Sequence, residues 1–150
     1  MPGLTDHDVE AVQARRASLR RACAGVQEAL RTPGGPGEGA VLAAVRELRH
    51  IWHVHTSDTE RRDGVLDQVV ADCPRLSPAV GRLRHEHQVV AESLRAVERL
   101  LDETAAEPHA DGAGEALPTL TGVLDTVDRH RRMGRDLLYQ AYNVDLGLGE

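Results

Sequence analysis

The chain has 150 residues, of which 41% are hydrophobic and only 2% aromatic, and its formal net charge is −6. This length predicts a single domain, residues 1–150, and a core built from Leu, Val and Ala favours helices over sheets. The negative charge argues against a nucleic-acid or anionic-membrane binder, and no apolar run is long enough to span a bilayer, so we expect a cytoplasmic protein.

Apolar residues recur at steps of three and four, the seam period of helix packing, in four long segments. These predicted helices cover about 5–31, 39–60, 77–102 and 116–142. Breakers at Thr32–Gly37 and a polar loop at Glu103–Gly114 separate them, and a shorter helical piece, Val65–Cys73, follows the second helix. The pattern is typical of an all-α, antiparallel up-down-up-down four-helix bundle with a short extra helix between helices 2 and 3.

Each apolar stripe is interrupted near its middle by one basic or imidazole residue. In chain order these are Arg16, His55, His87 and His130. An unpaired charge in such a position costs several kcal/mol, so these residues need a specific explanation. When alternate helices run in opposite directions, the four residues fall at nearly one level. The sequence therefore predicts a polar layer of three imidazoles and one guanidinium inside a Leu/Val core.

Imidazole nitrogens that converge inside a bundle are good ligands for a divalent transition metal, and bundles build metal sites in this way. We therefore predict His55, His87 and His130 as metal ligands. His53 and His85 lie two residues from a stripe position and point away from the core. The alternative is a layer of hydrogen-bonded core histidines that binds no metal.

Three short motifs lie on these helices, and together they resemble the hemerythrin-like (HHE cation-binding) family. They are the segments from His55 to Glu60, Glu86-His87, and His130 to Gly134. The segment Tyr139–Gly147, and Asp63-Gly64 with Pro74-Arg75-Leu76, are similar to an actinobacterial branch of that family. The resemblance implies a four-helix bundle whose histidines and bridging carboxylates hold a non-haem di-iron centre. Oxygen or small-molecule sensing, or oxidative chemistry, is implied by the resemblance alone.

The sequence departs from the family pattern at three positions. Arg16 replaces the histidine of helix 1, and Thr59 and Gly134 replace the two carboxylates that would bridge the irons. Two metal ions without bridging carboxylates would repel each other, and the guanidinium would add to the repulsion. We therefore expect one metal ion rather than a di-iron pair. This ion would be Fe, with Zn or Mn as alternatives, or the site would bind no metal at all.

Further residues are candidates for the surroundings of the site. Glu60 is a candidate fourth ligand, and Glu86 is expected either behind a histidine or paired with Arg16. Gly134 leaves space on the seam for water or a small anion. If no metal binds, a pocket lined by Arg16, Tyr139 and the histidines would bind a small molecule, or the bundle would act as a protein-interaction module.

The remaining reactive residues give weaker signals. Cys23 and Cys73 lie at apolar-stripe positions without a CxxC spacing, which indicates buried free thiols in a reducing compartment. No serine or cysteine has the surroundings of a catalytic nucleophile, so whether the protein is an enzyme stays open, as does the role of the tail after Asn143.

Overall fold

A computed structural model describes residues 3–31, 37–106, 112–144 and 146. Its elements are α1 (Asp6–Arg31), α2 (Gly37–Glu60), α3 (Val65–Asp72), the 3-10 turn η1 (Pro74–Leu76), α4 (Ser77–Ala106) and α5 (Gly112–Tyr142). The described part of the chain contains no strand, which confirms the predicted all-helical class. None of the helices in these residues is both long and apolar enough to cross a membrane.

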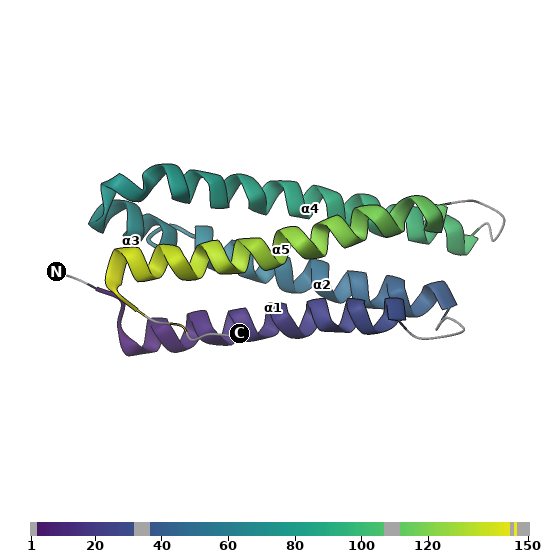
Figure 1. Ribbon diagram of the computed structural model, residues 1–150, viewed down its shortest axis with the longest axis horizontal. Coiled ribbons are helices and arrows are strands. Elements are labelled where there is room, and N and C mark those ends of the chain that lie inside the picture. The colour runs from purple at the N-terminus through teal and green to yellow at the C-terminus, as the bar shows by residue number, and fades with distance from the viewer. Residues whose placement is uncertain (1–2, 32–36, 107–111, 145, 147–150) are drawn as a thin grey trace.

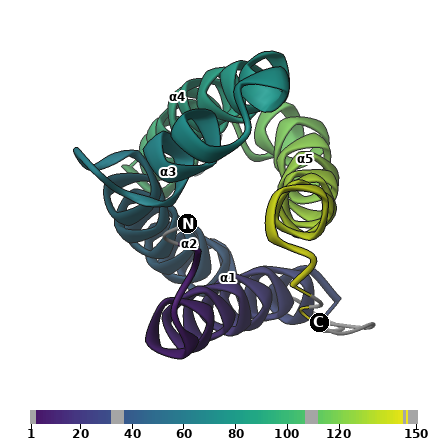
Figure 2. The ribbon, with the colours of Figure 1, turned by 90° about the vertical axis from the view of Figure 1, so that its left-hand side faces the viewer.

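The four long helices lie side by side along one axis (Figure 1) and enclose a common core when seen from the end (Figure 2). The beginning of α1 and the end of α5 lie at the same end of the molecule, where α3 is also found. Close backbone approaches connect α1 with α2, α2 with α4, and α4 with α5. The α1–α5 pair approaches less closely, so the side chains between these two helices have more room.

Local hydrogen bonds fix the start of α1, and local backbone geometry fixes the end of α5. Thr5 Oγ1 accepts a 3.1 Å hydrogen bond from the Asp8 backbone N–H, and Asp8 Oδ2 accepts a 2.9 Å bond from the Thr5 N–H. This reciprocal capping box makes Thr5 the N-cap of α1. At the other end Asn143 has φ 55°, the left-handed conformation that ends a helix, so α5 stops where the sequence predicted.

Three predicted boundaries were wrong by a few residues. Helix α2 begins at Gly37 rather than 39, α4 continues to Ala106 rather than 102, and α5 begins at Gly112 rather than 116. The predicted loop Glu103–Gly114 is therefore too long, because the Glu and Ala residues at its start favour helix and extend α4. Its centre, 107–111, and the predicted break at 32–36 lie outside the described residues.

The apolar core is divided into two clusters along the bundle axis. The larger cluster includes Leu19, Val26, Leu48, Trp52, Val90, Leu94, Val97, Leu120 and Val127. The smaller cluster, nearer α3, includes Val12, Leu66, Val69, Leu76, Val80, Leu83, Leu137, Leu138 and Leu146. Leu146 is almost fully buried, so this part of the tail packs on its own bundle. The predicted polar layer lies between the two clusters.

Candidate metal centre

The polar residues of the four stripes lie at one level, as the sequence predicted. On α4, buried His87 falls between Leu83 of the smaller cluster and Val90 of the larger one. Arg16 on α1 and His130 on α5 are buried at the same transition between the clusters, with exposures of 6% and 3%. His55 is half-buried and completes the layer from α2.

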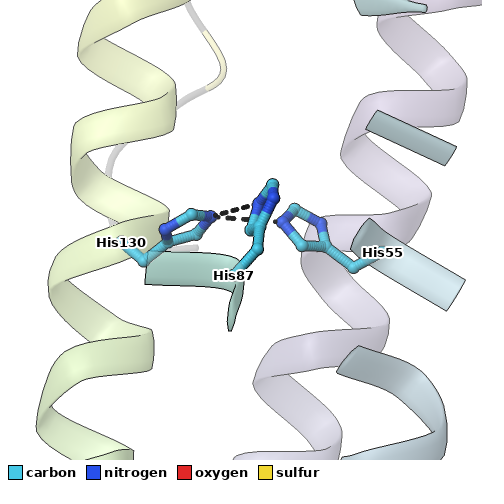
Figure 3. A group of neighbouring side chains, drawn as sticks. All are labelled: His55, His87 and His130. Atoms are coloured by element: carbon cyan, nitrogen blue, oxygen red, sulfur yellow. Dashed lines mark hydrogen bonds between the residues drawn. The ribbon is translucent and has the colours of Figure 1, made fainter. Parts of the chain in front are cut away.

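The three histidines point toward one another and present the same ring nitrogen (Figure 3). The Nε2 atom of His130 lies 3.1 Å from Nε2 of His87 and 3.3 Å from Nε2 of His55. One nitrogen from each of the three rings lies within 4.8 Å of the other two. The three residues predicted as ligands are therefore brought together by α2, α4 and α5.

Trp52 holds two of these helices in register next to the cluster. Its ring is almost fully buried, with its centroid 5.1–5.6 Å from each of the three imidazole centroids. Its Nε1–H donates a 3.0 Å hydrogen bond to the backbone carbonyl of His87, which ties α2 to α4. Trp52 takes the buried position on this side of α2, and its neighbour Ile51 is only partly buried.

Carboxylates lie behind two of the imidazoles, on the Nδ1 side. His130 Nδ1 donates a 3.1 Å hydrogen bond to Glu86, whose other oxygen accepts a 3.0 Å bond from Arg129. Glu60 lies 3.2 Å from Nδ1 of His87, in charge contact but not aligned as a hydrogen bond. A carboxylate on Nδ1 fixes the N–H at that nitrogen and leaves Nε2 as an acceptor, the arrangement found behind histidine metal ligands. Glu60 and Glu86 thus face the histidines from outside the cluster.

The cluster is electrically neutral at physiological pH because its imidazoles are hard to protonate. Burial, and then the neighbouring His87, lower the pKa of His130 to about 4. Burial is also the main cause that lowers the pKa of His87 and holds the pKa of His55 well below its ordinary value. Burial alone would raise the pKa of Glu86, but hydrogen bonds from Arg129 and His130 outweigh it and the pKa falls. The cluster therefore presents uncharged nitrogens, and the carboxylate of Glu86 behind His130 is ionised.

The contact between His87 and His130 is a hydrogen bond whose donor depends on which ring nitrogen carries the proton. Glu86 accepts the Nδ1 proton of His130, which leaves a lone pair on Nε2 of His130, 3.1 Å from Nε2 of His87. His87 donates to this lone pair when its proton is on Nε2, and it offers a second lone pair to a positive ion when its proton is on Nδ1, facing Glu60. Two nitrogens roughly 2.0–2.1 Å from a tetrahedral ion lie about 3.4 Å apart, close to the 3.1 and 3.3 Å separations here. The residues present therefore fit a single metal ion.

A cavity of about 60 Å³ adjoins the cluster on the side of α1 and α5. Predicted pocket residues Arg16, Thr59 and Gly134 line it, together with the three histidines. A Cβ atom on Gly134 would meet nothing within 4 Å, which confirms that this glycine leaves space. Tyr139 is 55% exposed and does not line the cavity, because α5 turns its neighbour Leu138 toward the core instead.

Arg16 spans the α1–α5 seam rather than pairing with either carboxylate behind the histidines. Its Nη1 donates a 2.6 Å hydrogen bond to the backbone carbonyl of Arg131, while Glu60 and Glu86 contact His87 and His130. Thr59, in place of a bridging carboxylate, donates its hydroxyl proton to the His55 carbonyl at 2.9 Å and stays on its own helix. Among the described residues that line the cavity, none carries a carboxylate.

Two arginines of the cavity, Arg15 and Arg131, were not predicted from the sequence. Arg131 is only 8% exposed and Arg15 is half-buried, and both line the cavity. The signal that could have found Arg131 is its place next to the stripe residue His130, on the arc of α5 that faces α1. Cys23 and Cys73 are free, as predicted, but half-buried rather than buried. Burial raises the pKa of Cys23 to about 11, which makes its thiol unreactive.

No family model, no curated protein and no solved structure matches this chain. The function must therefore be argued from the geometry and chemistry of the three-histidine cluster and the cavity next to it.

Proposed function

We propose that the chain is a hemerythrin-like, antiparallel four-helix bundle that binds one divalent transition-metal ion through Nε2 of His55, His87 and His130. The observation that carries the proposal is the convergence of three imidazole nitrogens in a buried layer, with Nε2 of His130 3.1 Å from Nε2 of His87 and 3.3 Å from Nε2 of His55. Burial opposes protonation, so the rings stay neutral, and each can offer its Nε2 lone pair to a cation when its proton is on Nδ1.

The donor set favours one ion rather than two. Three imidazole nitrogens suit Zn and Fe, and also Co as a spectroscopic substitute. A second ion would need oxygen ligands on the cavity side, where Thr59 and Gly134 stand and where Arg16 adds a fixed positive charge. Three protein ligands leave a coordination position open, which is the pattern of a reactive rather than a purely structural site. The metal, when bound, would supply a place for a small molecule to coordinate.

The resemblance to the hemerythrin-like family favours iron and a role in binding or sensing a small molecule. The chain's own residues position this layer. Glu86 orients the His130 ring through its hydrogen bond to Nδ1, and Trp52 fixes the position of His87 along the bundle axis through its bond to the His87 carbonyl. The two apolar clusters exclude bulk water from both sides of the layer. Whether the bound molecule is only sensed or also oxidised depends on the metal, because zinc has no redox chemistry.

The proposal is tested by metal stoichiometry in protein purified without a polyhistidine tag. The chelator-treated protein is titrated anaerobically with Co(II), Zn(II) and Fe(II), and the d–d bands of Co(II) report the ligand geometry. We expect one ion per chain and bands typical of four-coordinate Co(II). His87→Ala should remove binding, and His55→Ala should do the same with less effect on folding, because His55 is half-buried and its Nδ1 has no partner among the described residues.

The matched control is His85→Ala, two residues from His87 on the exposed side of α4. It should bind Co(II) as the unaltered chain does. Two ions per chain, no binding of any of the three metals, or equal losses in His85→Ala and His87→Ala would each overturn the proposal.

A second candidate needs no metal: the same cavity would bind a small molecule against Arg16, and the histidines would be a polar network. The cavity of about 60 Å³ is the observation in its favour. The metal titration distinguishes the two functions. Under the second candidate, none of the three metals binds, but a small molecule still does.

A further inference from the structure

A groove between α2 and α4 is separate from the cavity beside the histidines, because no described residue lines both. Its volume of about 420 Å³ falls within the range of small-molecule sites. One side runs along α2 from Arg46 to Thr56, and the other runs along α4 from Ala91 to Glu98. Trp52 is almost fully buried and forms the floor, while the arginines of the lining are exposed.

The groove is a positively charged hollow in a chain whose net charge is −6. Three arginines line it, Arg46, Arg49 and Arg95, against the single carboxylate of Glu98. Its lining side chains therefore carry a surplus of two positive charges when the histidines are neutral. A cleft lined mainly by one sign of charge raises the local concentration of ligands of the opposite sign.

Another surface hollow, at the start of α1, shows that arginines in such places are not always in excess. There Arg15 and Arg61 line the wall together with three carboxylates, those of Asp8, Asp58 and Asp63. The surplus positive charge is therefore a particular feature of the groove between α2 and α4.

Two of the arginines show how the groove binds an anionic group. Arg46 Nε donates a 3.2 Å hydrogen bond to one oxygen of Glu98, and Arg49 Nη1 donates a 2.5 Å bond to the other. Burial alone would raise the pKa of Glu98, but these bonds outweigh it and the pKa falls. Asp102 contacts Arg46 at 3.4 Å and does not line the groove. The two guanidinium groups thus converge on one small anionic group at the Glu98 end.

Arg95 is the arginine of the groove that remains available to a ligand. It is exposed, lies one turn from Glu98 on α4, and makes no hydrogen bond or ion pair with another described residue. Ala91, one turn further along α4, has the smallest side chain of the lining and leaves space beside Arg95. On the α2 side, His50 and His53 add ring nitrogens that can form hydrogen bonds.

We propose that this groove binds a phosphate monoester, with its phosphate group between Arg49 and Arg95 and the rest of the molecule over Ala91 and Trp52. Such a group carries about −1.5 to −2 charges near pH 7, which matches the surplus charge of the lining. Its three terminal oxygens can accept paired N–H groups from more than one guanidinium. The groove is larger than a phosphate group alone requires, which favours a phosphorylated small molecule. The site needs no metal and does not rest on the proposed function.

The site is tested on the full chain after chelator treatment, with AMP, inorganic phosphate and adenosine as probes. Calorimetric titration gives the dissociation constants. We expect AMP to bind with a dissociation constant below about 1 mM, inorganic phosphate to bind more weakly, and adenosine not to bind. Trp52 is the only tryptophan of the chain and lines the groove, so its fluorescence should change when inorganic phosphate is added.

Three exposed or half-buried positions give variants that should all fold. Arg95→Gln should weaken AMP binding at least tenfold, because it removes a charged partner of the phosphate. Glu98→Gln should strengthen it, because the competing carboxylate is lost, and damage to the fold would not produce such a gain. The matched control is Arg99→Gln, one turn from Arg95, exposed and outside the groove lining. It should leave the affinity for AMP unchanged.

The source of the phosphate group is distinguished by vesicles of phosphatidylcholine with phosphatidic acid, whose headgroup is also a phosphate monoester. Vesicles that bind the unaltered chain but not Arg95→Gln would assign the groove to a lipid headgroup, and no vesicle binding would assign it to a soluble ester. The inference is overturned if AMP binds more weakly than about 1 mM, if adenosine binds as tightly as AMP, or if Arg95→Gln and Arg99→Gln have the same affinity.

Discussion

Three of the four long helices place an imidazole in the polar layer, whereas α1 places a guanidinium there. His87, His130 and Arg16 are buried to a similar extent and occupy equivalent positions in their apolar stripes. Their electrostatics are opposite. Burial keeps the imidazoles neutral, so that their nitrogen lone pairs can bind a cation. The guanidinium stays positively charged and repels a cation.

This difference shows how one side chain changes the capacity of a symmetric scaffold. The periodicity that brings four residues to one level is common to all helices, so the scaffold itself offers four equivalent positions. The carboxylates behind the layer strengthen the asymmetry, because Glu60 and Glu86 contact His87 and His130 while Arg16 contacts a backbone carbonyl. The layer therefore has two chemically different sides, one of neutral imidazoles and one that contains a guanidinium.

The two sides should respond differently to pH, and this is the largest effect that we expect. The lowered pKa of His130, about 4, means that the unfolded chain binds a proton between pH 6.5 and about 4 that the metal-free folded chain does not. Stability is then present above pH 6.5 and is lost as the pH falls toward 4, by about 3 kcal/mol for His130. Urea denaturation of the metal-free protein at a series of pH values measures this loss.

Carboxylates also titrate in acid, so a control variant must separate their contribution to the stability loss from that of His130. His130→Leu should lack the loss between pH 6.5 and 4, whereas Arg16→Met should keep it, because the guanidinium does not titrate. If the free energy of unfolding has the same pH dependence in His130→Leu and in the unaltered chain, folding does not lower the pKa of His130.

The sequence was sufficient to predict the long helices and the polar layer, because both depend on spacing along single helices. A stripe such as that of α4, with His87 among six buried apolar residues, specifies both its buried face and the residue that interrupts it. The prediction that the four polar residues lie at one level along the bundle followed from the helix lengths and from the alternating direction of successive helices. All three histidines of the cluster were identified in this way.

The arginine side could not be predicted as well, because it depends on how far apart two helices lie. Arg131 belongs to a run of charged residues, Arg129 to Arg132, in which periodicity does not distinguish the buried member from its solvated neighbours. The loose α1–α5 seam, which gives Arg131 room, is a property of the assembled bundle. Tyr139 failed as a pocket residue for a related reason, since a small rotation of α5 directs Leu138 inward.

The carboxylate behind His130 should control metal affinity on the imidazole side. Glu86→Gln keeps a hydrogen-bond acceptor for Nδ1 but removes the negative charge, and we expect a 10- to 100-fold weaker affinity for Zn(II), on the order of changes seen at such positions. Competition with a chromophoric chelator measures it. Glu60→Gln should have a smaller effect because its contact with His87 is not aligned. Exposed Glu92→Gln is the control, and equal affinities in all three variants would contradict the role of Glu86.

Arg16→His exchanges the guanidinium for a fourth imidazole and so removes the asymmetry of the layer. We expect the affinity for Zn(II) to rise about tenfold, about 1.4 kcal/mol, because a repelling charge is replaced by a ligand. The metal-free protein should lose about 1 kcal/mol of stability with the hydrogen bond to the Arg131 carbonyl. Arg20→His, one turn away and exposed, is the control. A loss of stability without a gain in affinity would favour the metal-free function.

Gly134→Ala tests the cavity beside the polar layer, and its expected effect is the smallest of the four. Alanine favours a helix interior over glycine by about 0.5–1 kcal/mol, and the added methyl group meets no atom within 4 Å, so the free energy of unfolding should rise by this amount. Gly122→Ala, exposed on the same helix and equally free of close atoms, should give the same gain. Urea denaturation of both variants measures the gain. Gly134 lines the cavity beside the three-histidine cluster and Gly122 does not, so equal gains would mean that the cavity accepts the methyl group at no cost. A smaller gain in Gly134→Ala than in Gly122→Ala would contradict this and would mean that the open space beside the cluster is needed for the stability of the layer.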